Sequence, residues 1–382
     1  MSHIAEHYEE CTTVEELDAL LKAKEHPIVY DGFEPSGRMH IAQGLMKALS
    51  VKLLADAGCV WKIWIADLFA FLNHKLGGKL KDIQTCGKYF IEIFRAIFKE
   101  LGIPEESVQF LWTSEEVDKR SAEYWPLVME IAATFNLKRV MRCCTIMGKT
   151  EGESMAASQI FYPVMQCADI FFLKADICQL GRDQKKVNML ARDYCTEKKI
   201  KHKPVILSHH MLMGLTKDSL KMSKSNPDAA IFMDDSELDV RRKIKRAYCV
   251  PGEEEENPVL EYCKYIIFPW FNKLEVKRSE KNGGDVTFST YEELRDAFVS
   301  EKLHPADLKP ALATAVNAIL QPIRTHFKEN KEAFKLKKSV EAIVKKVKKQ
   351  KEKAEREAAE KKEAEKKQQG EEGEKVESPE EK

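Results

Sequence analysis

Strand-like and helix-like hydrophobic patterns alternate through the first part of the chain. A β-branched run at residues 28–30 precedes a turn, a helical stretch covers about residues 40–58, and residues 59–65 have the pattern of a strand. Large apolar side chains then recur at helical spacing from Asp82 to Leu101, and residues 108–112 form another strand-like run. This alternation predicts a parallel sheet that is covered by helices on both faces.

The pattern changes at about Ser236, after which it is mostly helical. Residues 238–248 are rich in Arg and Lys, and an apolar helix is indicated over residues 312–327. We therefore expect an α/β domain over residues 1–235 and an α-helical domain over residues 236–334.

The two ends of the chain differ from its body. Residues 1–25 have the composition of a short acidic helix, and no aromatic residue occurs after Phe334. Residues 349–382 consist almost entirely of Lys, Glu, Ala and Gln, followed by Gly, Glu, Ser and Pro. Such a segment can form a solvated helix but cannot bury a core. We expect residues 335–382 to be a charged, partly disordered tail.

Composition restricts the compartment and the kinds of partner. The 62 basic and 62 acidic residues cancel, so a nucleic-acid contact would come from a local patch and not from a field over the whole surface. The N-terminus lacks a signal-peptide pattern, and no apolar run approaches the ~18 residues that span a bilayer. The ten scattered cysteines include no C-x-x-C and fit free thiols in a reducing compartment. We expect a cytosolic protein without membrane contact or structural metal.

A basic motif, Lys221-Met222-Ser223-Lys224-Ser225, lies in a polar segment after Gly214. Lysines in a loop can approach a triphosphate and neutralise the charge that moves onto a leaving pyrophosphate. The alternative is an ordinary solvated basic loop.

The first predicted strand-to-helix turn carries Pro35-Ser36-Gly37-Arg38-Met39-His40-Ile41-Ala42-Gln43-Gly44. This turn is where a doubly wound fold places phosphates against a helix N-terminus. Together with the Lys221–Ser225 loop it resembles the class I aminoacyl-tRNA synthetases, whose signatures are His-Ile-Gly-His and Lys-Met-Ser-Lys-Ser. The resemblance implies a Rossmann-type catalytic domain that binds ATP with Mg²⁺. It assigns the phosphates to His40, Lys221 and Lys224, with Met222 and Ser223 also at the ATP.

One half of this motif departs from the family pattern. Ala42 and Gln43 stand where the family has a glycine and the second histidine. The eukaryotic tyrosyl enzymes relax this half of the motif, which makes the departure a mark of that subfamily. Gln43 is then expected to donate a hydrogen bond to ATP where the histidine would.

The segment Ser158 to Ile170 carries three polar residues at helical spacing. If it is helical, Tyr162, Gln166 and Asp169 lie at i, i+4 and i+7 on one face, with Pro163 in the first turn or at a kink. Polar groups among apolar neighbours need partners, because burying them unpaired is costly. They therefore form either a binding face or a self-satisfied buried network.

This segment closely resembles the tyrosine-binding helix of the tyrosyl-tRNA synthetases. The resemblance implies that Asp169 accepts a hydrogen bond from the substrate phenol, together with Tyr30, while Tyr162 and Gln166 hold its ammonium and carboxylate end. Tyrosyl-tRNA synthetases are the known case in which such groups reject phenylalanine by about four to five decades without editing.

A second family segment, Gly181-Arg182-Asp183-Gln184, follows a predicted strand. The family has Gly-x-Asp-Gln here, which implies that Gly181 and Asp183 lie at the ATP ribose and Gln184 at the tyrosine amine. Asp183 as the N-cap of the next helix is an interpretation that can hold beside it.

Several residues are candidates for contact with tRNA. The segment around Asp307 resembles the element with which archaeal and eukaryotic tyrosyl enzymes recognise the first anticodon base, although a helix cap is the alternative. Asn282 stands where relatives have an aromatic residue that stacks on that base. Candidates for the acceptor stem, or else ordinary solvated surface cations, are Lys185, Lys186, Arg139 and Arg142.

The resemblance covers roughly residues 26–330 and implies an enzyme that joins L-tyrosine to tRNA(Tyr) as a homodimer. The nearest alternative is the sister tryptophanyl enzyme, against which Asp169 and Tyr30 argue because an indole offers a single donor. A nucleotidylyltransferase would lack the helical domain with Asp307. A catalytically inactive RNA-binding paralogue is disfavoured by the intact Lys221–Ser225 loop.

Overall fold

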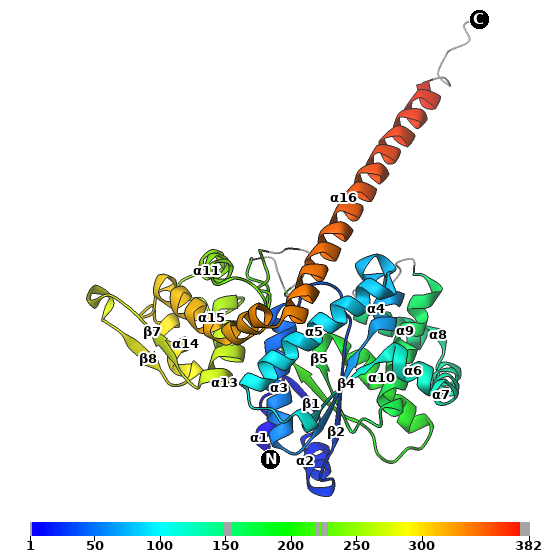
Figure 1. The fold of residues 1–382 in the computed structure, drawn as a ribbon, viewed down its shortest axis with the longest axis horizontal. Coiled ribbons are helices and arrows are strands. Elements are labelled where there is room, and N and C mark those ends of the chain that lie inside the picture. Colours follow the sequence, from blue (N-terminus) through cyan, green and yellow to red (C-terminus); the bar gives the residue numbers. More distant parts are fainter. Residues whose placement is uncertain (1, 148–154, 218–221, 223–225, 227, 375–382) are drawn as a thin grey trace, which may run out of the picture.

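A six-stranded sheet forms the centre of the N-terminal part of the chain (Figure 1). The computed structural model describes residues 2–147, 155–217, 222, 226 and 228–374. The strand order is β1-β6-β5-β2-β3-β4, and β1 is antiparallel to β6 while the other neighbours are parallel. The strands are β1 (Glu10–Thr12), β2 (Ile28–Phe33), β3 (Val60–Ile65), β4 (Val108–Trp112), β5 (Ile177–Gly181) and β6 (Val205–His209).

Helices cover both faces of this sheet, as predicted. Alternate residues of β2 divide between two buried clusters: Val29 and Phe33 belong to one, and Tyr30 belongs to the other. The helices of this part are α1 (Ser2–Ala5), α2 (Val14–Ala23), α3 (Ile41–Asp56), α4 (Asp67–Leu72), α5 (Leu80–Glu100), α6 (Thr113–Lys119), α7 (Ser121–Thr134), α8 (Leu137–Cys143), α9 (Ala157–Phe172) and α10 (Lys185–Glu197). Short 3₁₀ turns lie at Lys75–Gly78, Glu105–Ser107, Cys144–Met147 and Arg182–Gln184.

The order of the parallel strands positions the functional site. Successive strands are added on one side of β2, as β3 and β4, and on the other side from β5, as β6, so the order of strand addition reverses between the parallel neighbours β2 and β5. In doubly wound folds ligands bind at the carboxyl ends of the strands at such a switch point. The expected acidic helix over residues 1–25 is wrong in part, because Glu10–Thr12 pairs with β6 as an edge strand.

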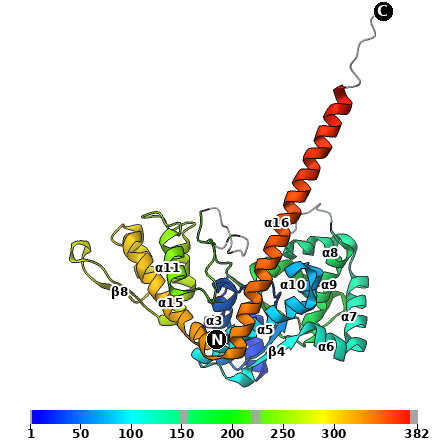
Figure 2. The same cartoon turned by 45° about the horizontal axis from the view of Figure 1, so that its top comes forward.

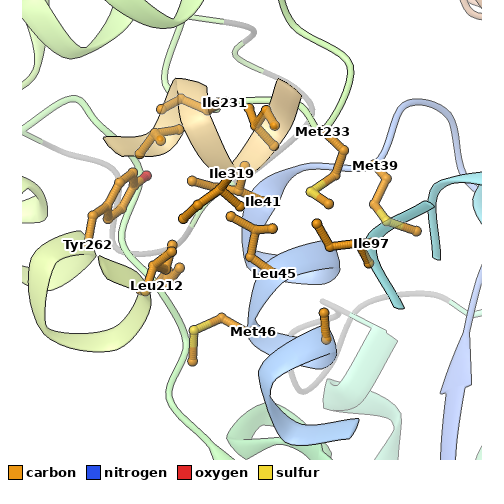
Figure 3. Close-up of a cluster of buried hydrophobic side chains, with 14 of the residues drawn as sticks. Met39, Ile41, Leu45, Met46, Ile97, Leu212, Ile231, Met233, Tyr262 and Ile319 are labelled. Atoms are coloured by element: carbon orange, nitrogen blue, oxygen red, sulfur yellow. The ribbon is translucent and has the colours of Figure 1, made fainter. Parts of the chain in front are cut away.

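The C-terminal part is mostly helical and shares a core with the sheet. It comprises α11 (Glu237–Arg246), α12 (Pro258–Tyr262), a π-helical turn (Cys263–Ile267), α13 (Phe268–Phe271), α14 (Tyr291–Val299) and α15 (Pro305–Glu329). Figure 3 shows Tyr262 and Ile319 from this part beside Ile41 and Leu45 of α3. A hairpin that the sequence patterns did not predict, β7 (Leu274–Val276) and β8 (Val286–Phe288), interrupts the helices, with a 3₁₀ turn at Glu280–Asn282.

The last helix, α16 (Lys331–Glu374), begins in the core and then projects away from the body of the protein (Figure 2). Ala333 and Val340 are buried, and Leu336 and Val344 pack against the same cluster. Their spacing of three and four residues places them on one helix face. The segment expected to be a tail from residue 335 therefore starts with packed helical turns, because its few apolar residues lie on a single stripe.

An ion-pair network joins α16 to the first strand-to-helix turn. Lys337 Nζ lies 3.3 Å from Asp234 Oδ2, and Arg38 Nη2 lies 2.5 Å from Asp234 Oδ1 and 2.8 Å from Asp235 Oδ1. Both carboxylates are buried, so each needs these cations as partners.

The cysteines and the helix lengths agree with the expectations from composition. All ten cysteines lie among the described residues and are free thiols. Within the described ranges, no helix combines the length and apolar character needed to cross a membrane.

Candidate active site

A cavity of about 350 Å³ opens at the carboxyl ends of β2 and β5. It brings together residues that the sequence analysis assigned to tyrosine and to ATP from segments far apart in the chain. Those residues are Tyr30, His40, Gln43, Tyr162, Gln166, Asp169, Gly181, Asp183, Gln184 and Met222. Lys221, Ser223 and Lys224 lie outside the described residues.

Asp169 is a buried carboxylate with two fixed hydrogen-bond donors. The Tyr124 hydroxyl donates to Oδ1 at 2.9 Å and the Trp64 indole Nε1 donates to Oδ2 at 3.0 Å. Burial raises the pKa of Asp169 well above its usual value, while both donors favour its charged form. Tyr30, also buried, lines the same cavity. Because carboxylate oxygens have further acceptor capacity, Asp169 can accept one more hydrogen bond from a ligand.

The other two residues of the predicted face bond to partners outside α9. The Tyr162 hydroxyl donates to Glu34 Oε1 at 2.6 Å, and Gln166 Nε2 donates to Gln184 Oε1 at 3.1 Å. Burial, followed by the charge of Glu34, raises the pKa of Tyr162 well above its usual value, so the phenol stays a donor. Both side chains thus have partners on other segments and also line the cavity, which a closed core network would not do.

The helix that carries this face accommodates an internal proline. Pro163 lies inside α9 and cannot donate to the Gln159 carbonyl one turn earlier. The Cys144 thiol lies 3.8 Å from that carbonyl oxygen and equally far from the Val140 carbonyl oxygen, so its single S–H can donate to either of them. The helix therefore continues through Pro163, which lies beyond the first turn of α9, so the first-turn alternative of the sequence analysis is wrong.

The first strand-to-helix turn is held by its own helix cap and by a distant segment. His40 is the N-cap of α3, and its Nδ1 accepts from the Gln43 N–H at 3.3 Å. The Ile41 N–H donates to the Ile231 carbonyl at 2.9 Å, and the Met233 N–H donates to the Met39 carbonyl at 2.8 Å. Figure 3 shows these two segments side by side. The chain that follows the Lys221–Ser225 loop is thus fastened directly to the turn that carries His40.

One residue of the basic loop is described, and it is anchored in the cavity. The Met222 N–H donates to the Leu212 carbonyl at 2.9 Å, and its side chain is buried. Met222 therefore fixes one point of the loop at the cavity wall.

The Gly181–Gln184 segment forms the turn after β5. Asp183 Oδ1 lies 2.8 Å from the position that a Cβ atom on Gly181 would take, so a side chain there would collide with the carboxylate. The next helix begins at Lys185 with Gln184 as N-cap and without a side-chain cap bond. Asp183 as a helix cap is therefore wrong, and its carboxylate faces the cavity.

A buried polar network below the cavity was not predicted. Lys47 forms an ion pair with Asp31 and donates to the Gln179 carbonyl at 3.0 Å. Gln179 Nε2 in turn lies 2.9 Å from His209 Nδ1. A local signal for it was the lysine within the apolar run of α3, since a lysine is almost never buried unless it is paired.

Other residues that the sequence analysis missed are Glu34, Trp64 and Tyr124. Glu34 lies in the same turn as the expected Tyr30, but nothing local indicates its bond to Tyr162, which is 128 positions away. Trp64 and Tyr124 are 105 and 45 positions from Asp169.

Two of the four cations proposed for the acceptor stem form ion pairs with carboxylates. Arg139 Nη2 lies 2.7 Å from Asp193 Oδ2, and Lys185 Nζ lies 2.8 Å from Glu10 Oε1. Lys186 and Arg142 are exposed.

Asp307 lies in the first turn of α15, about which two alternatives were open. The cap of this helix is His304, whose Nδ1 accepts from the Ala306 N–H at 3.1 Å, so Asp307 is not the cap. Asn282 Nδ2, from the loop of the β7–β8 hairpin, donates to Asp307 Oδ2 at 3.2 Å. The residue at the expected stacking position thus holds the carboxylate.

Comparisons with known proteins show the family of the chain. The family described as tRNA synthetases class I (W and Y) matches residues 22–321. Tyrosine–tRNA ligase 1, cytoplasmic, from Arabidopsis thaliana is 55% identical over 334 residues, which cover 87% of this chain and 86% of that protein.

Solved structures are similar over most of the chain. The tyrosyl-tRNA synthetase of Pyrococcus horikoshii, complexed with L-tyrosine, has a TM-score of 0.82 at 35% identity and covers 88% of this chain and 98% of its own. The Leishmania major tyrosyl-tRNA synthetase, in complex with tyrosinol, has a TM-score of 0.82 at 46% identity. The match covers 89% of this chain and 59% of the Leishmania chain.

Proposed function

The chain belongs to the class I tRNA synthetases as a tyrosine–tRNA ligase of the eukaryotic and archaeal type, and we infer that it charges tRNA(Tyr) with L-tyrosine in the cytoplasm. The observation that carries the proposal is the cavity at the β2–β5 switch point. This cavity is lined by the carboxylate of Asp169, which accepts hydrogen bonds from two fixed donors. It is also lined by His40, the N-cap of α3 in the first strand-to-helix turn.

The reaction has two steps. The tyrosine carboxylate attacks the α-phosphorus of ATP in line, a phosphorus–oxygen bond forms, and pyrophosphate leaves with the Mg²⁺ that entered bound to ATP. The 3′-terminal ribose hydroxyl of the tRNA then attacks the carbonyl carbon of the adenylate, and AMP leaves. The protein supplies positioning and charge stabilisation in both steps.

We propose the residue roles that the resemblance implies, and the position of the described residues in the cavity supports them. Asp169 and Tyr30 receive the substrate phenol, while Tyr162, Gln166 and Gln184 hold its ammonium and carboxylate end. Gly181 and Asp183 lie at the ribose of ATP. The groups assigned to the phosphates and the rest of the nucleotide are His40, Gln43, Lys221, Met222, Ser223 and Lys224.

Pyrophosphate exchange with each of the twenty amino acids tests this function. Tyrosine alone should support exchange, because an indole N–H gives Asp169 one donor in a different place from a phenol. Exchange with tryptophan at equal or better efficiency would contradict the assignment. Exchange with none would favour an RNA-binding paralogue.

For the whole chain we propose a catalytic domain over residues 1–235, an anticodon-binding domain over residues 236–334 and a charged tail. The carboxylate of Asp307, held by Asn282, fits the N1 and N2 donors of a guanine at the first anticodon position. Lys185, Lys186, Arg139 and Arg142 remain candidates for the acceptor stem, of which the ion-paired Lys185 and Arg139 are the less available.

Replacing Asp307 with alanine tests the anticodon role. A good base contact contributes about 1–3 kcal/mol, so aminoacylation of guanine-bearing transcripts should fall by about fivefold to 150-fold. Tyrosine-dependent pyrophosphate exchange should stay at the parental rate. The matched control is Asp296→Ala, an exposed carboxylate on α14. The same ratio of guanine to adenine transcripts in Asp307→Ala and parent would leave Asp307 without this role.

We also propose that the enzyme is a homodimer. Helices α7, α8 and α9 carry five exposed large apolar side chains, an unusual concentration for a solvated surface. The side chains and their exposed fractions are Trp125 (39%), Met129 (55%), Leu137 (58%), Met141 (41%) and Phe161 (47%).

Replacing Leu137 with glutamate tests the dimer. A buried charge at an interface costs at least about 2 kcal/mol, roughly thirtyfold in Kd, so the variant should sediment as a monomer at micromolar concentration. Leu238→Glu is the control, because Leu238 on α11 is 78% exposed and lies outside these helices. A parental mass for Leu137→Glu, or equal dissociation of both variants, would place the interface elsewhere.

A further inference from the structure

Lys47 is a buried ammonium whose three N–H groups all have acceptors. Its side chain is 2% exposed and lines the floor of the cavity. The acceptors around Nζ are Asp31 Oδ2, the Gln179 backbone oxygen and Gln179 Oε1. An ammonium has three donors and no lone pair, so this arrangement satisfies the charged form completely.

The ammonium decides how the Gln179 amide is turned. Because Lys47 can only donate, the amide oxygen of Gln179 must face it, and the NH₂ group therefore faces His209 Nδ1 at 2.9 Å. An amide NH₂ can only donate, so His209 Nδ1 is the acceptor. Burial lowers the pKa of His209 well below its usual value, and Lys47 and His210 add repulsion against its charged form. The ring is neutral, with its proton on Nε2.

The protonated nitrogen lies next to the turn assigned to the ribose. His209 Nε2 is 3.5 Å from the position that a Cβ atom on Gly181 would take, and Asp183 Oδ1 is 2.8 Å from the same position. A donor and an acceptor thus both lie beside the Gly181 turn at the wall of the cavity, and Met211 Sδ is also 2.8 Å from the Cβ position, so a side chain on Gly181 would collide with its neighbours. A sugar hydroxyl both accepts and donates, so one that enters the cavity beside this turn can accept from the imidazole and donate to the carboxylate.

We propose that His209 is a nucleotide-binding residue whose Nε2–H donates to a ribose hydroxyl of ATP. Asp31, Lys47 and Gln179 are positioning residues that act through it by fixing its tautomer. This inference rests on the proposed function and deepens it. It adds an uncharged hydrogen-bond donor, His209, to the site proposed for the ribose of ATP. It also gives the buried Lys47–Asp31 ion pair a role in ATP binding, through the tautomer of His209.

The first experiment compares His209→Leu with the parent enzyme in tyrosine-dependent pyrophosphate exchange. Loss of one hydrogen bond should raise the KM for ATP about three- to tenfold and leave the KM for tyrosine unchanged. With 2′-deoxy-ATP and 3′-deoxy-ATP, the analogue that lacks the bound hydroxyl should be used equally well by both proteins. If the variant is weakened by the same factor on ATP and on both analogues, His209 does not bind the ribose.

The second experiment inverts the tautomer without removing the ring. In Gln179→Glu the carboxylate still accepts from Lys47 but can only accept from His209, so the imidazole proton moves to Nδ1. The ¹⁵N spectrum of histidine-labelled enzyme should show this change, and the KM for ATP should rise as in His209→Leu. Gln109→Glu, an exposed position on strand β4, is the matched control.

The outcomes separate the inference from the function. An inverted tautomer with a parental KM for ATP would overturn the proposal, and so would an Nδ1–H tautomer in the parent spectrum. If Gln179→Glu does not fold, the deoxy-ATP comparison with His209→Leu decides. Absence of exchange in the parent enzyme would refute the proposed function, whereas the tautomer measurement needs no activity.

Discussion

Replacing Asp169 with asparagine should abolish most of the enzyme's preference for tyrosine over phenylalanine. In the parent, Oδ1 and Oδ2 accept from Tyr124 and Trp64, and the substrate phenol would bring a third donor to the same carboxylate. Asparagine has nearly the same shape, but it replaces one acceptor oxygen with a donor NH₂. At least one of the three donors, which are the Tyr124 hydroxyl, the Trp64 indole N–H and the substrate phenol, then faces the NH₂ group of the asparagine and not an acceptor oxygen.

The expected size follows from the cost of unpaired buried polar groups. Tyrosyl-tRNA synthetases are known to reject phenylalanine by about four to five decades, and we expect the Asp169→Asn ratio to fall to about one or two decades. The measurement is kcat/KM for pyrophosphate exchange with each amino acid. Asp176→Asn is the control, because Asp176 bonds Lys24 and the Ile28 N–H and does not line the cavity. An unchanged ratio in Asp169→Asn would move the phenol site elsewhere.

Replacing Lys224 with alanine should slow adenylate formation by about two to three decades, the usual effect of losing one preorganised charge donor at a transition state. Lys224 lies two residues from Met222, which is buried in the cavity wall and bonded to the Leu212 carbonyl. Beyond the loop, the chain pairs with the turn that carries His40. The described residues on the two sides of Lys224 thus lie at the cavity wall and beside the turn that carries His40.

The test separates the chemical step from binding. Single-turnover formation of the adenylate should slow, while the Kd of tyrosine, measured by equilibrium dialysis, should stay close to the parental value. Lys217→Ala is the matched control: Lys217 lies before the loop, with its Nζ 5.7 Å from the Tyr248 ring centroid. If tyrosine affinity falls in Lys224→Ala and the chemical step is intact, the loop does not act on the transition state.

The sequence by itself determined the elements whose pattern is local. Strand β4 has the predicted bounds, residues 108–112, and α5 covers Leu80–Glu100 where the spacing indicated residues 82–101. The i, i+4, i+7 spacing of Tyr162, Gln166 and Asp169 was enough to place them on one face, because helix geometry fixes it within two turns. The residues proposed to bind the nucleotide were also predicted from the sequence. Each of them lies in a short contiguous motif, which can be recognised without the fold.

Only the tertiary structure decided what those residues bond to. The hydrogen-bond donors to Asp169 are the side chains of Trp64 and Tyr124. Lys47 of α3 donates to Gln179 of strand β5, which is 132 positions away in the chain. Such pairs leave no periodic trace, because they depend on which strands become neighbours. The β7–β8 hairpin escaped prediction since its three-residue strands are too short for an alternating pattern. The packed start of α16 escaped for a related reason: its apolar stripe is sparse, and its burial depends on the facing surface of α5.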